Sequence, residues 1–213
     1  MARYPNGING SLAGTIGTVV ASTMNGKPYL KSRSKKRSRS KHPKEIANRN
    51  KFRACHAFLK PLKDVVREGF RTETGSGGFL KAKSHLLKYA FEGTWENQQV
   101  NPALVKLSTG DLPLPENIAV TIADEYTLEF SWDAPAINKD HSKDQAILIA
   151  YAPEKSFAIF DMTGAFRYMG KDRMMVDFNQ AAGFDVYIWF VSGDRKRRSE
   201  SVYLGRLNKA AKN

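Results

Sequence analysis

The sequence predicts an α+β chain in which a β-hairpin, a basic arm and two helices precede an all-β sandwich. Two runs of β-compatible residues flank Asn25-Gly26, and apolar residues recur every three or four positions between 43 and 70. About seven short runs rich in strand-forming residues fill the C-terminal half. We expect a hairpin-arm-helix domain at 1–108, a sandwich at 109–208 and a tail at 209–213.

The hairpin is predicted by its turn. Asn-Gly lies between Thr18–Met24 and Lys27–Ser32, and it suits the type I′ turn of a two-residue hairpin. Pro28 has no N–H to donate, so the second strand is expected at a sheet edge. The glycines of this region lack the spacing of a nucleotide-binding loop, and they favour close packing, either internal or between subunits. The expected assembly residues are Gly10, Gly14, Gly17, Asn25 and Gly26.

A basic arm follows the hairpin. Lys31–Lys41 holds seven basic residues among eleven and no acidic residue. So charged and serine-rich a segment buries little, and we expect a flexible arm. Residues 1–71 carry 17 Lys and Arg against 3 Asp and Glu, whereas the remainder carries 17 against 18. This asymmetry predicts an anionic partner: a phosphate backbone, an anionic surface or an acidic protein patch. A solvated linker is the alternative.

The arm and the helix after it supply the predicted anion contacts. Each contact between a cation and a phosphate releases counterions and makes the affinity salt-dependent. Nothing in the segment reads base edges, so little sequence specificity is expected. The predicted contact residues are Lys31, Arg33, Lys35, Lys36, Arg37, Arg39, Lys41, Arg49 and Arg53.

Two helices are predicted next. The apolar residues between Ile46 and Phe70 have helical spacing, and Pro61 is expected to split this segment because it lacks a backbone donor. A second helix is predicted over Phe79–Phe91, followed by a linker with one short strand at Ala103–Leu107.

The C-terminal part has the pattern of an all-β domain. The residues from Tyr126 to Asp133 alternate apolar and polar side chains, which is typical of a strand with one buried face. Seven strands within about 95 residues match a β-sandwich. The predicted strands are Ile118–Ile122, Thr127–Trp132, Ala146–Tyr151, Ser156–Asp161, Met174–Phe178, Val186–Val191 and Ser201–Leu204.

Two segments resemble parts of fibronectin type III domains. Leu128–Pro135 resembles their second strand, in which a tryptophan, here Trp132, lies in the core. Phe184–Val191 and the Ser192-Gly193-Asp194 turn resemble the end of such a domain. The resemblance implies an immunoglobulin-like or fibronectin type III-like sandwich, and an immunoglobulin-like sandwich of different topology is the alternative.

The whole chain resembles a family of small uncharacterised proteins from Bacteroidetes bacteria, known as a domain of unknown function. The resemblance lies in Gly7-Ile8-Asn9-Gly10, the spacing of Gly14 and Gly17, the Asn25-Gly26 hairpin with Tyr29, and Tyr203-Leu204-Gly205. It implies the same order of hairpin, basic stretch, helix and β-rich part, and it implies no activity.

No catalytic pattern is present in the sequence. The G-x-S-x-G motif is absent, and one cysteine, Cys55, with four scattered histidines gives neither a disulfide framework nor a multi-cysteine zinc site. We expect no enzymatic activity, cofactor, metal or small-molecule substrate. No apolar run is long enough to span a bilayer or to form a signal peptide. A cytoplasmic protein, or a component of a virion or other assembly, is therefore expected.

Two classes of function remain. The first is a structural subunit of a homo-oligomer or larger assembly, such as a phage particle or a filament, that uses the hairpin and arm for subunit or genome contacts. The second is a protein that binds DNA or RNA through the arm without sequence specificity. Tyr4 and Tyr29 are candidate rings for stacking on bases, although the arm itself contains no aromatic residue, which weakens the case for single-strand recognition. The glycine-rich hairpin favours the first.

Overall fold

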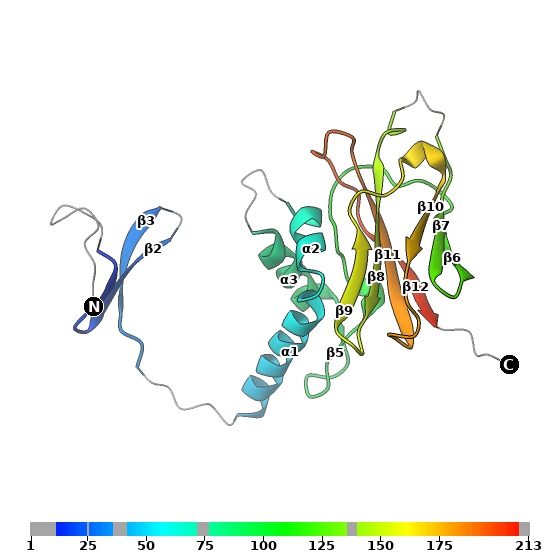
Figure 1. Cartoon of the computed structure of the whole chain (residues 1–213). Coiled ribbons are helices and arrows are strands. Elements are labelled where there is room, and N and C mark those ends of the chain that lie inside the picture. The colour runs from blue at the N-terminus through cyan, green and yellow to red at the C-terminus, as the bar shows by residue number, and fades with distance from the viewer. Residues whose placement is uncertain (1–11, 25, 36–41, 72–76, 136–139, 209–213) are drawn as a thin grey trace. The chain divides into compact units, whose positions relative to one another are not determined.

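The computed structural model describes residues 12–24, 26–35, 42–71, 77–135 and 140–208. Contacts divide the chain into two compact units (Figure 1). The first unit is Met1–Lys41 and the second unit is His42–Asn213. Their strands and helices together give the predicted α+β class.

The first unit contains one three-stranded antiparallel sheet in the order β1-β2-β3. Pairing of β2 with β3 runs from Val19 opposite Ser32 to Met24 opposite Lys27, which confirms the predicted hairpin. β3 lies at an edge of the sheet, as the missing N–H of Pro28 requires. The first two residues of the predicted arm therefore belong to a strand. The strands are β1 (Gly14–Ile16), β2 (Val19–Met24) and β3 (Lys27–Ser32).

The second unit begins with helices α1 (Pro43–Leu59), α2 (Lys63–Gly69) and α3 (Gly78–Tyr89). Pro61 lies between α1 and α2, so the predicted break is confirmed.

A short pair of strands, β4 (Phe91–Glu92) and β5 (Gln99–Val100), follows the helices. The prediction of a strand at Ala103–Leu107 is wrong, because this segment begins with η2 (Pro102–Leu104), a turn of 3-10 helix. Its first position is proline, and the Asn101 side chain accepts a hydrogen bond from the Ala103 N–H at 2.9 Å. Asparagine before a helical proline caps a turn rather than extending a strand.

Seven further strands form two antiparallel sheets, one ordered β12-β11-β8-β9 and the other β10-β7-β6. A strand lies at or near each of the seven predicted positions. The main displacement is in β10, which begins and ends three residues before the predicted range. η3 (Arg167–Met169) precedes it. The strands are β6 (Ala119–Asp124), β7 (Thr127–Ser131), β8 (Gln145–Ala152), β9 (Phe157–Asp161), β10 (Lys171–Met175), β11 (Gly183–Val191) and β12 (Val202–Asn208).

The four-stranded sheet is covered on both faces (Figure 1). On β11, Tyr187 and Trp189 pack in one cluster with buried residues of the three helices, whereas Ile188 and Phe190 pack in another with Phe130 of β7. All nine residues of β11 are therefore buried, which accounts for its nearly continuous apolar sequence. The helices and the four-stranded sheet share a core, so the expected boundary near residue 108 falls inside the second unit.

The helix-to-sheet core leads to a test with Leu59→Ala. Leu59 is fully buried in the cluster that contains Trp189. We expect the substitution to lower the free energy of unfolding by about 2–5 kcal/mol, because it leaves a cavity. Urea denaturation followed by tryptophan fluorescence measures this loss. Leu80→Ala on α3 is the control, since Leu80 is 68% exposed. Equal losses in the two variants would contradict the packing of α1 on the sheet.

Candidate functional site

The first unit carries positive charge that it cannot neutralise itself. Its 41 residues include nine Lys and Arg and no Asp or Glu, whereas the second unit holds 25 Lys and Arg against 21 Asp and Glu. None of the ion pairs between described side chains involves Lys27, Lys31, Arg33 or Lys35. The charge of the first unit must therefore be balanced by groups outside that unit.

The alternation of β3 places part of this charge on one side of the sheet. Side chains of a strand point alternately to its two faces, so Lys27, Tyr29 and Lys31 share a face. The backbone N–H of Arg33 donates to the Thr18 carbonyl at 2.7 Å, which continues the pairing one residue beyond β3. We call Lys27, Tyr29, Lys31 and Arg33 the basic stripe. Successive members lie about 6.8 Å apart along the strand, and the stripe spans about 20 Å.

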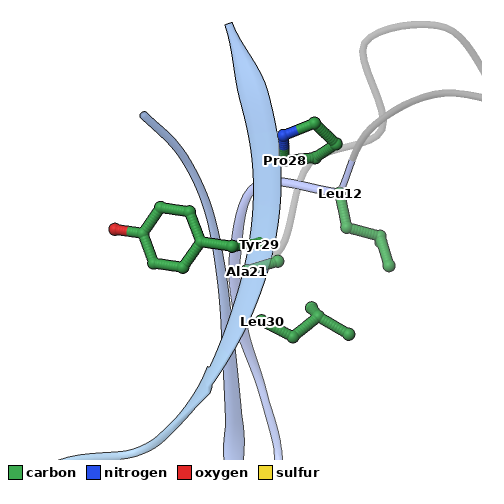
Figure 2. A pocket seen from close by; sticks show the side chains of 5 residues that line it. All are labelled: Leu12, Ala21, Pro28, Tyr29 and Leu30. Atoms are coloured by element: carbon green, nitrogen blue, oxygen red, sulfur yellow. The ribbon is translucent and has the colours of Figure 1, made fainter. Parts of the chain in front are cut away.

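The opposite face of the sheet is apolar. The register joins Ala21 to Leu30 and Ile16 to Val19, and Figure 2 shows the Leu12 and Leu30 side chains on the side of β3 away from the Tyr29 ring. Leu30 is 65% exposed, Ile16 44% and Val19 37%. We call this set the apolar face; its residues are Leu12, Ile16, Val19, Ala21, Pro28 and Leu30.

The apolar face has little cover within the described part of the first unit. A depression of about 400 Å³ opens there, lined by Leu12, Ala21, Pro28, Tyr29 and Leu30. Ala21 is the one buried residue in that described part. A small β-sheet is stable only when its hydrophobic face packs against other atoms. The exposed apolar face is therefore suited to contact with another molecule.

Not all predicted contact residues lie in this sheet. Arg49 and Arg53 are exposed on α1 of the second unit, four residues apart on one side of the helix. Arg53 donates to Asn50 Oδ1 at 3.4 Å. Lys35 is exposed two residues beyond the stripe. The remaining predicted residues, Gly10, Asn25, Lys36, Arg37, Arg39 and Lys41, lie outside the described residues.

Three predicted assembly glycines occur in the sheet. Gly14 pairs with Ala21, and Gly17 and Gly26 lie in the two turns with φ of 56° and 77°. A Cβ added at Gly17 or Gly26 would meet no atom within 4 Å, so positive φ accounts for glycine there.

Sequence reasoning missed one member of the stripe, Lys27, and it did not group Tyr29 with the cations. Both residues lie outside the predicted arm, because composition defined that segment. The signal that would have found them is the period of two, since positions 27, 29, 31, 33 and 35 are Lys, Tyr, Lys, Arg and Lys.

Comparison with known proteins places the chain in a protein family. A family model described as "Family of unknown function (DUF6266)" matches residues 11–205. The chain belongs to this family. The expected membership of an uncharacterised family is thus confirmed, and a search of curated proteins finds no match.

One solved structure is similar, the "Crystal structure of S. aureus TarS 217-571", at 14% identity and a TM-score of 0.27. The similarity covers 74% of this chain and 46% of the TarS chain. This chain therefore spans less than half the length of the TarS structure that it matches. So low a TM-score supports no transfer of activity.

The buried polar groups of the second unit join elements together. Asp185 of β11 is 1% exposed; it accepts a hydrogen bond from the Tyr203 hydroxyl at 2.9 Å and lies 3.5 Å from the Arg206 guanidinium. Burial raises the pKa of the Asp185 carboxyl, and the bond from Tyr203 and the charge of Arg206 oppose this rise. These contacts fasten β12 to β11.

A second buried group lies around Asp144, 3.2 Å from His141 Nδ1 and 3.6 Å from Arg167. Burial raises the pKa of the Asp144 carboxyl, and the interactions with His141 and Arg167 oppose this rise. Arg167 also donates to the Pro113 carbonyl at 2.7 Å and accepts from Trp132 Nε1 at 2.8 Å through its own carbonyl. The group therefore fixes the loops around β7 and β8.

The described residues contain no group of three or more His, Cys, Asp or Glu side chains placed to hold a metal ion. Within the same residues, no helix is both long and apolar enough to cross a membrane.

Cys55 provides a chemical test of the helical core. The thiol is fully buried on α1, and burial raises its pKa to about 11 from 9.0. Two pH units correspond to roughly a hundredfold less thiolate, the reactive form. We expect native protein at pH 8 to react with a disulfide reagent at least about a hundredfold more slowly than protein unfolded in urea. Stoichiometric labelling of the native chain within minutes would contradict this burial.

Proposed function

We propose that the chain is a non-enzymatic structural subunit that associates with further copies of itself through the apolar face. The exposed apolar face of the first unit is the observation that carries this proposal. In such an assembly, the cations of the same unit contact an anionic component, for example a packaged genome.

Burial of the apolar face supplies the driving force. Covering a Leu or Ile side chain stabilises a contact by roughly 1.5–3 kcal/mol. Leu12, Ile16, Val19 and Leu30 lie on one face, and a second copy offers the same face in return, so a two-fold contact covers both at once. The unpaired edge of β3 also suits addition of a strand.

Charge opposes this association. Each first unit brings nine cations and no carboxylate, so two of them in contact repel one another. Salt screens the repulsion over about 10 Å at 0.1 M, and bound anions remove it. Association through the apolar face is therefore expected to strengthen with ionic strength.

The second unit supports a scaffold role. We infer a fibronectin type III-like sandwich there, because seven antiparallel strands are divided three and four between two sheets. Trp132, which follows β7, is buried with its ring 5.3 Å from that of Phe190 on the facing sheet. Sandwich domains of this kind commonly present loops and edges to other proteins.

The second candidate function is nucleic-acid binding without sequence specificity. The absence of any carboxylate among the nine cations of the first unit favours it. Counterion release makes such binding weaken with salt, which is the opposite of the dependence expected for apolar association.

Light scattering on nuclease-treated full-length protein tests the assembly. We expect masses above the 23.9 kDa of one chain, and a larger mean mass at 500 mM than at 50 mM NaCl. Leu30→Ser is expected to reduce the mass toward that of a monomer, because Leu30 is 65% exposed, more than Ile16 or Val19 on the same face.

Leu80→Ser is the matched control, since Leu80 on α3 is 68% exposed against 65% for Leu30. We expect it to leave the mass unchanged. A monomeric mass at every salt concentration, or equal effects of the two substitutions on the mass, would contradict the assembly proposal. Particles that dissociate on nuclease treatment would favour the second candidate.

A further inference from the structure

The basic stripe combines charge with an exposed aromatic ring. Tyr29 is 39% exposed, and it lies on β3 between Lys27 and Lys31 on the same face. Arg33 continues the stripe by its backbone bond to Thr18. The ring points away from the apolar face, so burial of that face leaves it accessible (Figure 2).

We propose that the basic stripe binds single-stranded nucleic acid, with a base stacked on Tyr29 and phosphates held by Lys27, Lys31 and Arg33. The inference rests on the second candidate function and names its substrate class and its site. It does not depend on self-association.

The neighbours of the stripe leave its charges uncompensated. The cross-strand partners of Lys27, Tyr29 and Lys31 are Met24, Ser22 and Val20, all uncharged. The first unit holds no carboxylate to compete for the cations. The Ser22 hydroxyl, opposite Tyr29, is a further donor for a phosphate oxygen.

The position of the ring favours a single strand over a duplex. Single-strand binders combine cations that follow the backbone with aromatic rings on which successive bases stack. In a duplex the base faces are already stacked, and freeing one requires unpairing. Lysines and arginines alone bind duplex phosphates equally well, so Tyr29 is the element that discriminates.

The stripe offers little means of reading sequence. Base edges are recognised by Asn, Gln, Arg or Lys contacts in defined geometry. The stripe has no Asn or Gln, and the proposal assigns its cations, Lys27, Lys31 and Arg33, to phosphates. A base stacked on tyrosine contributes affinity whatever its identity.

Fluorescence anisotropy with the full-length, nucleic-acid-free protein tests the proposal. The probes are a labelled oligothymidylate and a labelled duplex with the same number of phosphates, titrated between 50 and 200 mM NaCl. We expect tighter binding of the single strand. Tyr29→Leu is expected to weaken that binding roughly 5- to 150-fold, the range for loss of one stacked base, and Tyr29→Phe to retain it.

The matched control is Tyr126→Leu. Tyr126 is 46% exposed in the second unit, and its replacement is expected to leave affinity unchanged. Circular dichroism with a thermal melt confirms that each variant remains folded. Loss of binding in Tyr29→Phe as well as in Tyr29→Leu, with both folded, would overturn stacking.

Charge variants test the phosphate contacts. Lys31→Gln and Arg33→Gln are each expected to reduce the slope of log affinity against log salt by about 0.7, the single-strand value per contact. Lys171→Gln, at an exposed lysine of β10, is expected to leave the slope unchanged.

The outcomes separate this inference from the function it rests on. Equal affinity for single strand and duplex, with no effect of Tyr29→Leu, overturns the inference and leaves nonspecific nucleic-acid binding standing. Failure to bind either probe at 50 mM NaCl overturns both, and it leaves the self-association proposal to be judged by light scattering.

Discussion

The separation of charge along the chain is the constraint on which the rest depends. A first unit with nine cations and no carboxylate cannot neutralise itself, whatever conformation it adopts. β3 sorts part of that charge onto one face and Leu30 onto the other. The two proposals are therefore linked. If anions bind at the basic stripe, they reduce the repulsion that opposes the proposed contact through the apolar face, and each event then favours the other.

The second unit has the opposite character. Helices cover one face of its four-stranded sheet and a second sheet covers the other, so β8 and β11 lie in the interior. Its buried carboxyls, Asp144 and Asp185, are held by side chains from neighbouring elements. These contacts stabilise the fold of the second unit. In the described part of the first unit, by contrast, exposed apolar and cationic residues share one small sheet with a single buried residue, Ala21.

Local sequence patterns predicted much of this fold. They did not predict which distant segments pack against one another. Asn25-Gly26 gives the hairpin and Pro61 the helix break, because turn and proline effects act within a few residues. The packing of α1 on β8 and β11 joins segments about a hundred residues apart, so no pattern within a few residues predicts it. Composition likewise found the cations of the arm but missed Lys27, and it did not group Tyr29 with them. Both residues join the same stripe only through the alternation of a strand.

Native-state hydrogen exchange tests most directly whether the first unit is built for contact with other molecules. For nucleic-acid-free protein at low salt and low concentration, we expect the amides of β2 and β3 to exchange far faster than those of β8 and β11, because little is buried around them. Raising the salt and protein concentration, or adding an oligonucleotide, is expected to slow exchange in β2 and β3 alone. Amides in β2 and β3 that are already as protected as those of β11 in the dilute chain would contradict the account.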